Sequence, residues 1–358
     1  MRTVVIVLKN PPFYGCGDLL EELAAIGEAE EARFLPFTQE TASLLFGYGA
    51  CAKSLLVCAE EKDVPSLSAS LCERFHEFLQ CDENGSGVFT QGEFDLFLFV
   101  SDGKNRREFL KNVCIPRLKR RGLLREKLVF RMIGAEREKI VQCIEKCKRL
   151  YPSCETLKFG ISERFDDFRV EISYEADAPK TLLDGVARQF AETFSENLYA
   201  LDDTPIEKRL CELLKLRGKK ISVAESFTGG GVGRRIVSVP GASEVYFVGL
   251  NTYDGDAKIK RLNVSPYTLN TLGAVSDQTA YEMCAGLLST GDCGAAIATT
   301  GLAGPNSDES GLPVGLCFLA AGAEGKIYIA RHIFSGTREE ITEKAINHAL
   351  FWAYRHLK

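Results

Sequence analysis

Histidine is scarce in this 358-residue sequence, and long apolar runs are missing from it. None of the four histidines lies in a glycine-rich or acidic motif: His76, His332, His348 and His356. A Ser-His-Asp triad or a histidine-built zinc site therefore has little support. No apolar run approaches the roughly 18 residues of a membrane span, and the start MRTVVIVLKN lacks the apolar region and cleavage site of a signal peptide. We therefore expect no membrane partner.

The thirteen cysteines include no C-x-x-C pair and are scattered from Cys16 to Cys317. A secreted disulfide scaffold is short, rich in cysteine and even in its cysteine count, so this pattern predicts a reducing compartment, the cytoplasm. Cys143, Cys147 and Cys154 could suggest a metal site, but no histidine is near them in the sequence. Buried structural thiols are the favoured interpretation. We expect no metal and no organic cofactor.

Charge is unevenly distributed along the chain, although the net charge is only −5. Residues 1–103 carry 6 basic and 17 acidic side chains, whereas residues 104–149 carry 16 basic and 5 acidic ones. A basic block of this kind can attract nucleic acid or anionic ligands. Docking of the block against acidic neighbours within the chain is the favoured interpretation.

Hydrophobic periodicity predicts an α/β protein with three parts. Residues 1–125 alternate strand and helix around the apolar runs Thr3–Leu8 and Leu96–Val100, with a helix from Asp18 to Ile26, which favours a mostly parallel sheet. Residues 126–200 combine two amphipathic helices with an alternating strand, which is typical of a small α+β module. Residues 201–358 form a C-terminal α/β domain that begins at a polar linker. There Thr204 and Glu207 match a capping box, with Pro205 at the first helical position.

One segment matches the spacing of a calcium-binding loop, from Asp82 through Asn84, Ser86 and Gly87 to Glu93. Such a loop needs an exit helix, but the residues that follow Glu93 are aromatic and β-branched, as in a buried strand. A surface turn is therefore favoured over calcium binding.

The C-terminal domain contains the segment with the clearest chemical signal. The segment Ile221-Ser222-Val223-Ala224 predicts a strand, which runs into Ser226, Thr228, Gly229 and Gly230 before a helix begins near Val232. This order places hydroxyl groups and backbone amides at a helix N-terminus, a geometry that holds a phosphate or an oxyanion. Many glycine-rich turns are only structural, and this one matches neither a Walker loop nor a dinucleotide fingerprint.

Other residues of this domain could serve the serine. A partly buried Lys258 with a lowered pKa could accept the proton of the Ser226 hydroxyl, and Tyr253 could relay or donate a proton. The alternative is that Lys258 is an ordinary surface lysine. Ser243 lies in a Pro-Gly turn, and Thr300 and Gly301 follow an apolar strand. Arg338, at the predicted start of the last helix, suits a carboxylate or a phosphate.

Seven short motifs, taken in order, resemble those of the CinA family, in particular its C-terminal domain that acts as nicotinamide-nucleotide amidase. They are Ala224-Glu225-Ser226-x-Thr228-Gly229-Gly230, Pro240-Gly241-x-Ser243, Tyr253-x4-Lys258, Ala274-Val275-Ser276, Thr300-Gly301-x-Ala303-Gly304-Pro305, Pro313-Val314-Gly315 and Phe334-x-Gly336-x-Arg338.

This resemblance implies hydrolysis of the carboxamide of nicotinamide mononucleotide, a pyridine nucleotide, with release of ammonia. It implies Ser226 as nucleophile, Lys258 as its base and Tyr253 as an assistant. It also implies that the chain forms a homo-oligomer. The remaining matched residues are implied to shape the substrate site: Thr228, Gly229, Gly230, Ser243, Thr300, Gly301 and Arg338. Phe227, Thr337 and Thr342 replace a cysteine, an aspartate and an arginine usual in the family, which could alter substrate affinity.

The resemblance extends upstream. Residues 126–200 resemble the KH-like module of full-length CinA proteins, and residues 1–125 resemble their molybdopterin-binding-like domain. The latter has no G-T-E-L after the first strand, and Phe99–Gly103 stands where a T-G-G-x-G-P-T loop is expected. The resemblance therefore implies a degenerate domain without ADP-ribose pyrophosphatase activity.

Two alternatives to a nicotinamide mononucleotide amidase remain open from the sequence. One is a nucleotide- or nucleic-acid-binding protein that uses the basic block and the KH-like module. Against it, the block has few aromatic residues and the module has no G-x-x-G motif, so nucleic acid is the less favoured partner. The other alternative is hydrolysis of a different small amide or pyridine nucleotide.

Overall fold

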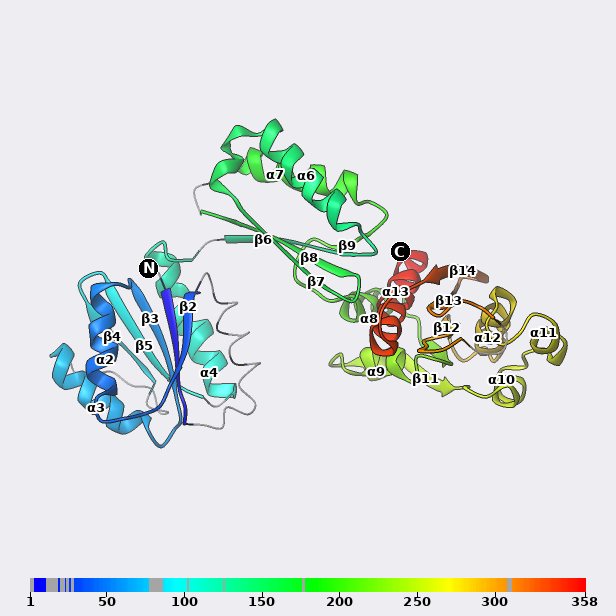
Figure 1. The fold of residues 1–358 in the computed structure, drawn as a ribbon, viewed down its shortest axis with the longest axis horizontal. Helices are drawn as coiled ribbons and strands as arrows, with labels where there is room; N and C mark the ends of the chain where they lie inside the picture. Colours follow the sequence, from blue (N-terminus) through cyan, green and yellow to red (C-terminus); the bar gives the residue numbers. More distant parts are fainter. Residues whose placement is uncertain are drawn as a thin grey trace. The chain divides into compact units, whose positions relative to one another are not determined.

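The computed structural model describes residues 3–10, 19, 23, 26, 29–76, 86–101, 103–124, 126–175, 178–307 and 311–358 (Figure 1). The chain divides into two compact units, Met1–Glu126 with Ser173–Ala178 and Lys127–Ile172 with Pro179–Lys358. The described residues build three sheets flanked by helices, which confirms the α/β class. The boundaries of the three predicted parts stay a prediction.

The first unit contains a five-stranded sheet in the order β2-β1-β3-β5-β4. Neighbours among β2, β1, β3 and β5 are parallel, and only β4 runs antiparallel to β5, so the expected mostly parallel sheet is confirmed. Every residue of β1 and β5 is buried, because helices cover both faces of such a sheet. The elements are β1 (Thr3–Leu8), β2 (Ala29–Leu35), α2 (Thr41–Gly47), β3 (Ser54–Ala59), α3 (Val64–Phe75), β4 (Gly87–Gln91), β5 (Phe94–Val100), α4 (Gly103–Phe109), a π-helical turn (Leu110–Cys114) and α5 (Ile115–Arg120).

Two predictions for this unit fall partly on residues that the structure does not describe. Most of the expected helix from Asp18 to Ile26 lies outside the described residues, as do Asp82 and Asn84 of the calcium-loop pattern. Glu93 is described, and it lies in the tight turn between β4 and β5 with its side chain 86% exposed. Among the described residues, no group of three or more His, Cys, Asp or Glu side chains could hold a metal ion.

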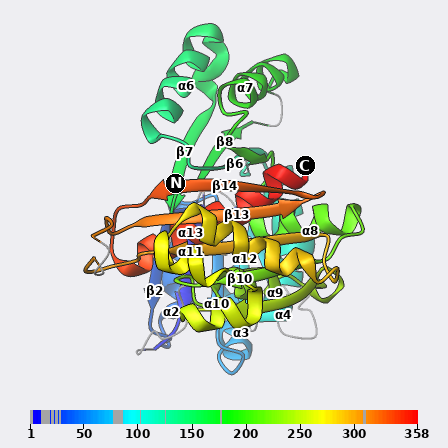
Figure 2. The same cartoon turned by 90° about the vertical axis from the view of Figure 1, so that its right-hand side faces the viewer.

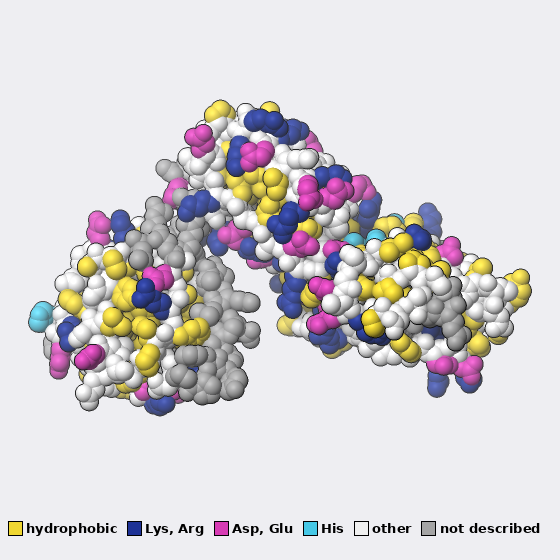
Figure 3. All heavy atoms as spheres, in the orientation of Figure 1, with side chains coloured by type: hydrophobic (Ala, Val, Ile, Leu, Met, Phe, Trp, Pro, Cys, Tyr) yellow, Lys and Arg dark blue, Asp and Glu magenta, His cyan; other side chains and the backbone are white. Residues whose placement is uncertain are grey.

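The basic block pairs with acidic side chains inside the chain. Asp95 is fully buried, and its carboxylate lies 3.0 Å from Nη2 of Arg117 and 2.6 Å from Nε of Arg121. Arg131 lies 2.5 Å from the carboxylate of Asp167. For these three arginines the intramolecular interpretation is confirmed. Figure 3 shows basic and acidic side chains mixed over the visible surface of helices α6 and α7.

The second sheet has the order β7-β8-β6-β9. Helix α6 buries Ile140, Cys143, Ile144 and Cys147, which confirms its amphipathic character, whereas Val141, expected on the same buried side, is 45% exposed. All described cysteines are free thiols. The elements are β6 (Glu126–Ile133), α6 (Arg137–Leu150), β7 (Lys158–Arg164), β8 (Asp167–Tyr174), α7 (Lys180–Thr193) and β9 (Leu198–Ala200).

The third sheet carries the predicted site and has the order β11-β10-β12-β13-β14. Strands β11, β10 and β12 are parallel, whereas β13 and β14 are antiparallel to their neighbours. The elements are α8 (Ile206–Leu216), β10 (Ile221–Glu225), α9 (Gly231–Val237), a 3-10 turn (Ala242–Glu244), β11 (Tyr246–Asn251), α10 (Gly255–Leu262), α11 (Pro266–Thr271), α12 (Asp277–Ser289), β12 (Ala295–Gly301), β13 (Leu316–Ala323), β14 (Lys326–Ile333) and α13 (Arg338–Leu357).

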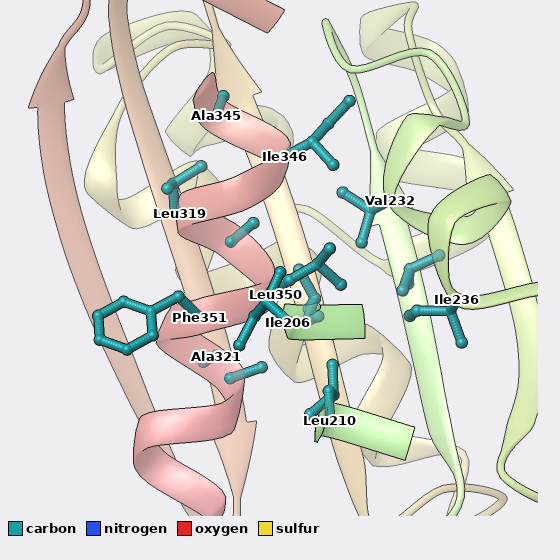
Figure 4. Packing of buried hydrophobic residues seen from close by; sticks show 14 of the residues in the cluster. Ile206, Leu210, Val232, Ile236, Leu319, Ala321, Ala345, Ile346, Leu350 and Phe351 are labelled. Atoms are coloured by element: carbon teal, nitrogen blue, oxygen red, sulfur yellow. The ribbon is translucent and has the colours of Figure 1, made fainter. Parts of the chain in front are cut away.

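Helices cover both faces of this sheet. Figure 1 shows α8, α9 and α13 on one face, and Figure 2 shows α10, α11 and α12 on the other, turned toward the viewer. In Figure 4 the long helix α13 lies on the sheet, and its residues Ile346 and Leu350 point toward α8 and α9. Helix α9 comes so close to α13 that a Cβ atom at Gly231 would stand 2.3 Å from Cδ1 of Ile346. This packing fixes α9 and the turn before it.

The predicted capping box at the start of α8 is wrong. The helix begins at Ile206 with Pro205 as its N-cap residue, and no side chain caps it. Thr204 instead donates its backbone N–H to Oδ1 of Asp202 (2.9 Å), and the carboxylate of Glu207 pairs with Arg235 at 2.7 Å. Asp202, two residues before Thr204, thus forms a local turn with the Thr204 amide. The capping box does not form, because Glu207 binds Arg235 instead.

No helix in the described part of the chain combines the length and the apolar character that crossing a membrane requires.

Candidate active site

Most of the predicted site residues lie at one edge of the third sheet. Parallel strands end at the same edge, where α/β proteins commonly bind ligands. Ser226 directly follows β10, Tyr253 follows β11, and Thr300 lies at the end of β12. Arg338 begins α13, the helix that follows β14, and β14 ends at this same edge. The topology therefore collects side chains from four separate motifs.

Ser226 and Lys258 are in direct contact. Nζ of Lys258 lies 3.2 Å from Oγ of Ser226. Lys258 comes from α10, and it is fully buried, whereas Ser226 is 8% exposed. The alternative of an ordinary surface lysine is therefore wrong.

Two backbone carbonyl groups hold the lysine amine in place. Nζ donates to the carbonyl oxygens of Thr252 (2.7 Å) and Tyr253 (3.0 Å). Burial lowers the pKa of Lys258, and the charge of Asp254 opposes this shift only in part. A neutral amine has two N–H donors and one lone pair. If the two donors bind these carbonyl groups, the lone pair is left for the hydroxyl proton of Ser226, which is the arrangement of a nucleophile and its base.

A buried carboxylate outside the predicted site residues, that of Glu225, organises the turn after β10. Its oxygens accept hydrogen bonds from the Thr228 hydroxyl (2.7 Å) and from the amides of Gly230, Val232 and Gly233 (3.1, 3.0 and 2.9 Å). The sequence signal was a glutamate placed between a strand and a helix N-terminus, where acidic side chains are favourable.

The expected anion cradle is therefore arranged differently. The amide of Gly230 binds Glu225, and that of Gly229 donates to the carbonyl of Ser226 at 3.1 Å, so neither is available to an oxyanion. The amides of Phe227 and Thr228 donate no hydrogen bond to any residue that the structure describes. The Thr228 hydroxyl points inward to Glu225, which leaves the backbone as the part of Thr228 that can meet a ligand.

The loops around this edge tie further predicted residues to one another. Thr300 is 1% exposed and donates its hydroxyl to the carbonyl of Ala274 (2.6 Å). Gly301 lies against β13, where a Cβ atom would stand 2.5 Å from Cβ of Cys317. Arg338 is exposed, and its Nη1 donates to the carbonyl of Gly304 (2.7 Å), which leaves its other guanidinium donors for a ligand.

Two of the residues that differ from the usual family pattern have structural partners. The hydroxyl of Thr337 accepts from the amide of Glu340 (3.3 Å), and the Glu340 carboxylate accepts from the amide of Thr337 (2.7 Å), so the pair forms the capping box of α13. Thr342 donates its hydroxyl to the carbonyl of Arg338 (2.8 Å). Both threonines stabilise the turn of helix that presents Arg338.

Two predicted site residues are placed differently from the others. The carbonyl of Tyr253 holds Lys258, but its side chain is 67% exposed. Ser243 precedes β11 and therefore lies at the opposite edge of the sheet from Ser226, about 15 Å away along a five-residue strand. It lines a surface cavity of about 530 Å³ together with Val237–Ala242 and Tyr246. One chain thus does not bring Ser243 to Ser226, and self-association of the chain stays a prediction.

Comparisons with known proteins agree with the motifs. The family model described as CinA C-terminal domain matches residues 203–357. A solved CinA superfamily protein from Enterobacter cloacae is 32% identical, with 45% of this chain and 98% of that chain covered and a TM-score of 0.42. A "Putative competence-damage inducible protein" of Caldanaerobacter subterraneus subsp. tengcongensis is 32% identical over 232 residues, which are 64% of this chain and 55% of that protein. The matched part of the chain spans about half the length of this relative and of two further proteins of the same description, from Caldicellulosiruptor saccharolyticus and Clostridium acetobutylicum.

A protein of the same description from Clostridium kluyveri is matched over a longer stretch. It is 31% identical over 283 residues, which cover 76% of this chain and 67% of the relative. The match therefore reaches well beyond the C-terminal domain. With the motifs of the C-terminal sheet and these two comparisons, the chain belongs to the CinA family.

Proposed function

We propose that this chain hydrolyses the carboxamide of nicotinamide mononucleotide to give nicotinate mononucleotide and ammonia. The observation that carries the proposal is the contact between Oγ of Ser226 and the buried amine of Lys258, 3.2 Å apart. An aromatic carboxamide resists water at neutral pH, so an enzyme must supply a nucleophile, a base and donors for an oxyanion. Membership of the CinA family and the amidase motifs support this choice of substrate.

The reaction proceeds in two halves in this proposal. In the first, Oγ of Ser226 attacks the carboxamide carbon while Lys258 takes the hydroxyl proton, and the amides of Phe227 and Thr228 donate to the oxyanion. The carbon–nitrogen bond then breaks, and Lys258 returns the proton to the leaving nitrogen, which departs as ammonia. In the second half, Lys258 takes a proton from water, whose oxygen attacks the acyl carbon. The ester bond to Ser226 breaks, and Oγ recovers the proton.

Two residues on neighbouring elements are proposed to position the nucleotide. Arg338 offers free guanidinium donors at the same sheet edge, which suits the phosphate of a mononucleotide. The hydroxyl of Thr300 binds the carbonyl of Ala274 and so keeps the loop around Ala274 against the end of β12. Thr300 thereby shapes the wall of the site. No metal or organic cofactor takes part in this mechanism.

The test is ammonia release from nicotinamide mononucleotide by the wild type and by Ser226→Ala and Lys258→Ala variants. A matched control is Lys260→Ala, because Lys260 lies on the same helix with its side chain 70% exposed. We expect activity in the wild type and the control, and loss of at least about 10³-fold in the other two. An active Ser226→Ala enzyme would refute the mechanism in which Ser226 forms a covalent intermediate.

The binding alternative has a separate readout. Inactivity of a folded wild type would favour a nucleotide- or nucleic-acid-binding protein, whose affinity for a labelled oligonucleotide falls steeply with salt. The ion pairs of Arg117, Arg121 and Arg131 count against it, because these side chains are already neutralised within the chain.

A further inference from the structure

We propose that Glu225 is a positioning residue of the amidase, whose carboxylate holds the turn that presents the Ser226 hydroxyl to Lys258. This inference rests on the proposed function. It assigns a specific task to a residue that neither touches the substrate nor transfers a proton.

The carboxylate joins the two ends of the turn. Oε2 accepts from the Thr228 hydroxyl, the Gly230 amide and the Val232 amide, while Oε1 accepts from the Gly233 amide. Four donors on residues 228–233 thus converge on one side chain that is 1% exposed. Because Ser226 is covalently next to Glu225, the length and direction of this side chain decide where Ser226 lies relative to α9.

Strand β12 extends the network through Thr299. The hydroxyls of Thr228 and Thr299 are 2.7 Å apart and buried. Since a carboxylate only accepts, Thr228 must donate to Glu225, and Thr299 must therefore donate to Thr228. The carbonyl of Thr299 also accepts the amide of Ser226 at 3.0 Å. The main chain and the side chain of one β12 residue thus hold both sides of the nucleophile.

The backbone of Glu225 links the turn to the base as well. Its carbonyl accepts the amide of Thr252 at 2.8 Å, and the carbonyl of Thr252 accepts Nζ of Lys258 at 2.7 Å. Glu225 is therefore the residue through which β10, α9 and the loop that holds Lys258 are connected. A shift of Glu225 displaces the nucleophile and the base relative to each other.

Only a carboxylate meets all four donors at once. In glutamine one oxygen is replaced by an NH₂ group, which would face a donor and lose at least one of the four hydrogen bonds. The variant keeps the side-chain size, so the fold survives while the turn relaxes. A displacement of about 1 Å between reacting groups costs up to about 10²-fold in rate. The substrate contact proposed for Arg338 and the wall that Thr300 shapes lie on other elements and stay intact.

The experiment compares Glu225→Gln with Glu282→Gln, using ammonia release for kcat and KM and thermal unfolding for stability. Glu282 is a matched control, because its carboxylate also accepts a backbone amide (Ser265, 2.8 Å) and a threonine hydroxyl (Thr268, 2.7 Å) in the same domain, but it lies on α12 and not in the turn that carries Ser226. We expect Glu225→Gln to lower kcat by about 10²-fold with KM within about threefold of wild type. Glu282→Gln keeps both constants and changes only the melting temperature.

Two further arms complete the test. Formate added to a Glu225→Ala variant should restore part of the lost kcat, because a small carboxylate can enter the space of the missing one. A fluorophosphonate reagent, detected by intact mass, should label Ser226 more slowly in Glu225→Gln than in the wild type. This arm does not depend on the substrate assignment, so a wild type that is labelled yet inactive would refute the proposed function alone.

Three results would overturn the inference. One is an unchanged kcat and labelling rate in Glu225→Gln, and another is a loss of kcat that Glu282→Gln shares. The third is a wild type that neither turns over nor is labelled, which would also remove the proposed function.

Discussion

The buried amine of Lys258 predicts how activity depends on pH. As a base it must be neutral, and burial already lowers its pKa from the ordinary value near 10.5. Raising the pH increases the neutral fraction, so kcat/KM should rise with pH and level off once the lowered pKa has been passed. Below that point the neutral fraction changes about tenfold for each pH unit. The plot of log kcat/KM against pH should therefore have a slope near +1.

The same pKa shift predicts a pH-dependent stability. The unfolded chain binds a proton at Lys258 up to about pH 10.5, whereas the folded chain releases it at the lower pKa. Between these two values the unfolded state holds more protons, so this residue makes the free energy of unfolding rise with pH. Below the lowered pKa and above 10.5 its contribution does not change with pH. Replacement by methionine removes the titrating group and with it this slope.

The assay measures ammonia release between pH 6 and 10, together with urea unfolding of the wild type and Lys258→Met at the same pH values. Unfolding curves identify the range in which the enzyme stays folded, so that loss of structure is not mistaken for titration. Activity that falls as the pH rises would refute Lys258 as the base. Equal stability slopes in the two proteins would refute the shifted pKa.

The remaining predictions concern stability. Gly315→Ala should lower the free energy of unfolding by at least about 3 kcal/mol, because φ is +89° and a Cβ atom would lie 1.8 Å from the carbonyl oxygen of Phe334. At Gly325 φ is +76° and a Cβ atom would meet no other atom within 4 Å, so Gly325→Ala should cost only about 1–2 kcal/mol. Thermal unfolding of both variants measures the two losses, and equal losses would contradict the steric reasoning. Asp95→Asn should destabilise the first unit by about 3 kcal/mol in urea, because it leaves two arginines without their buried partner. The exposed Glu93→Gln should stay within about 0.5 kcal/mol of wild type, and a matching loss there would refute the argument.

The nucleophile and its base were predictable because short motifs fix them locally. Ser226 stands in a strand–turn–helix pattern, and Lys258 lies on the next such unit, so the parallel strands β10 and β11 bring them to the same edge. Their contact needed the structure, since no local pattern shows that Nζ of Lys258 reaches Oγ of Ser226.

The position of Ser243 shows what the motifs leave out. A helix between two parallel strands returns the chain to the edge at which the first strand began. Ser243 lies at the end of that return, so the strand order alone would have placed it away from Ser226. The capping box at Thr204 failed for a more local reason, since Asp202 and Arg235 offer better partners than the motif assumes.

The role of Glu225 could be predicted only in part. An acidic residue before a helix suggests a cap, but three amides and a hydroxyl on a single carboxylate depend on the close packing of α9 against α13 at Gly231. Such packing is set by residues more than a hundred positions apart and leaves no local signal.

The position of β11 at the margin of its sheet has a consequence for how the enzyme loses activity on heating. β11 pairs with β10 on one side, and its neighbour order places no strand of the described chain on the other. An edge strand detaches from its sheet at a lower free-energy cost than an inner strand does. Since β11 leads into the loop whose carbonyl groups hold the lysine, a detached β11 carries the base away while the serine stays with the inner strands. Catalysis should therefore fail through a local opening, at temperatures where most of the domain is still folded.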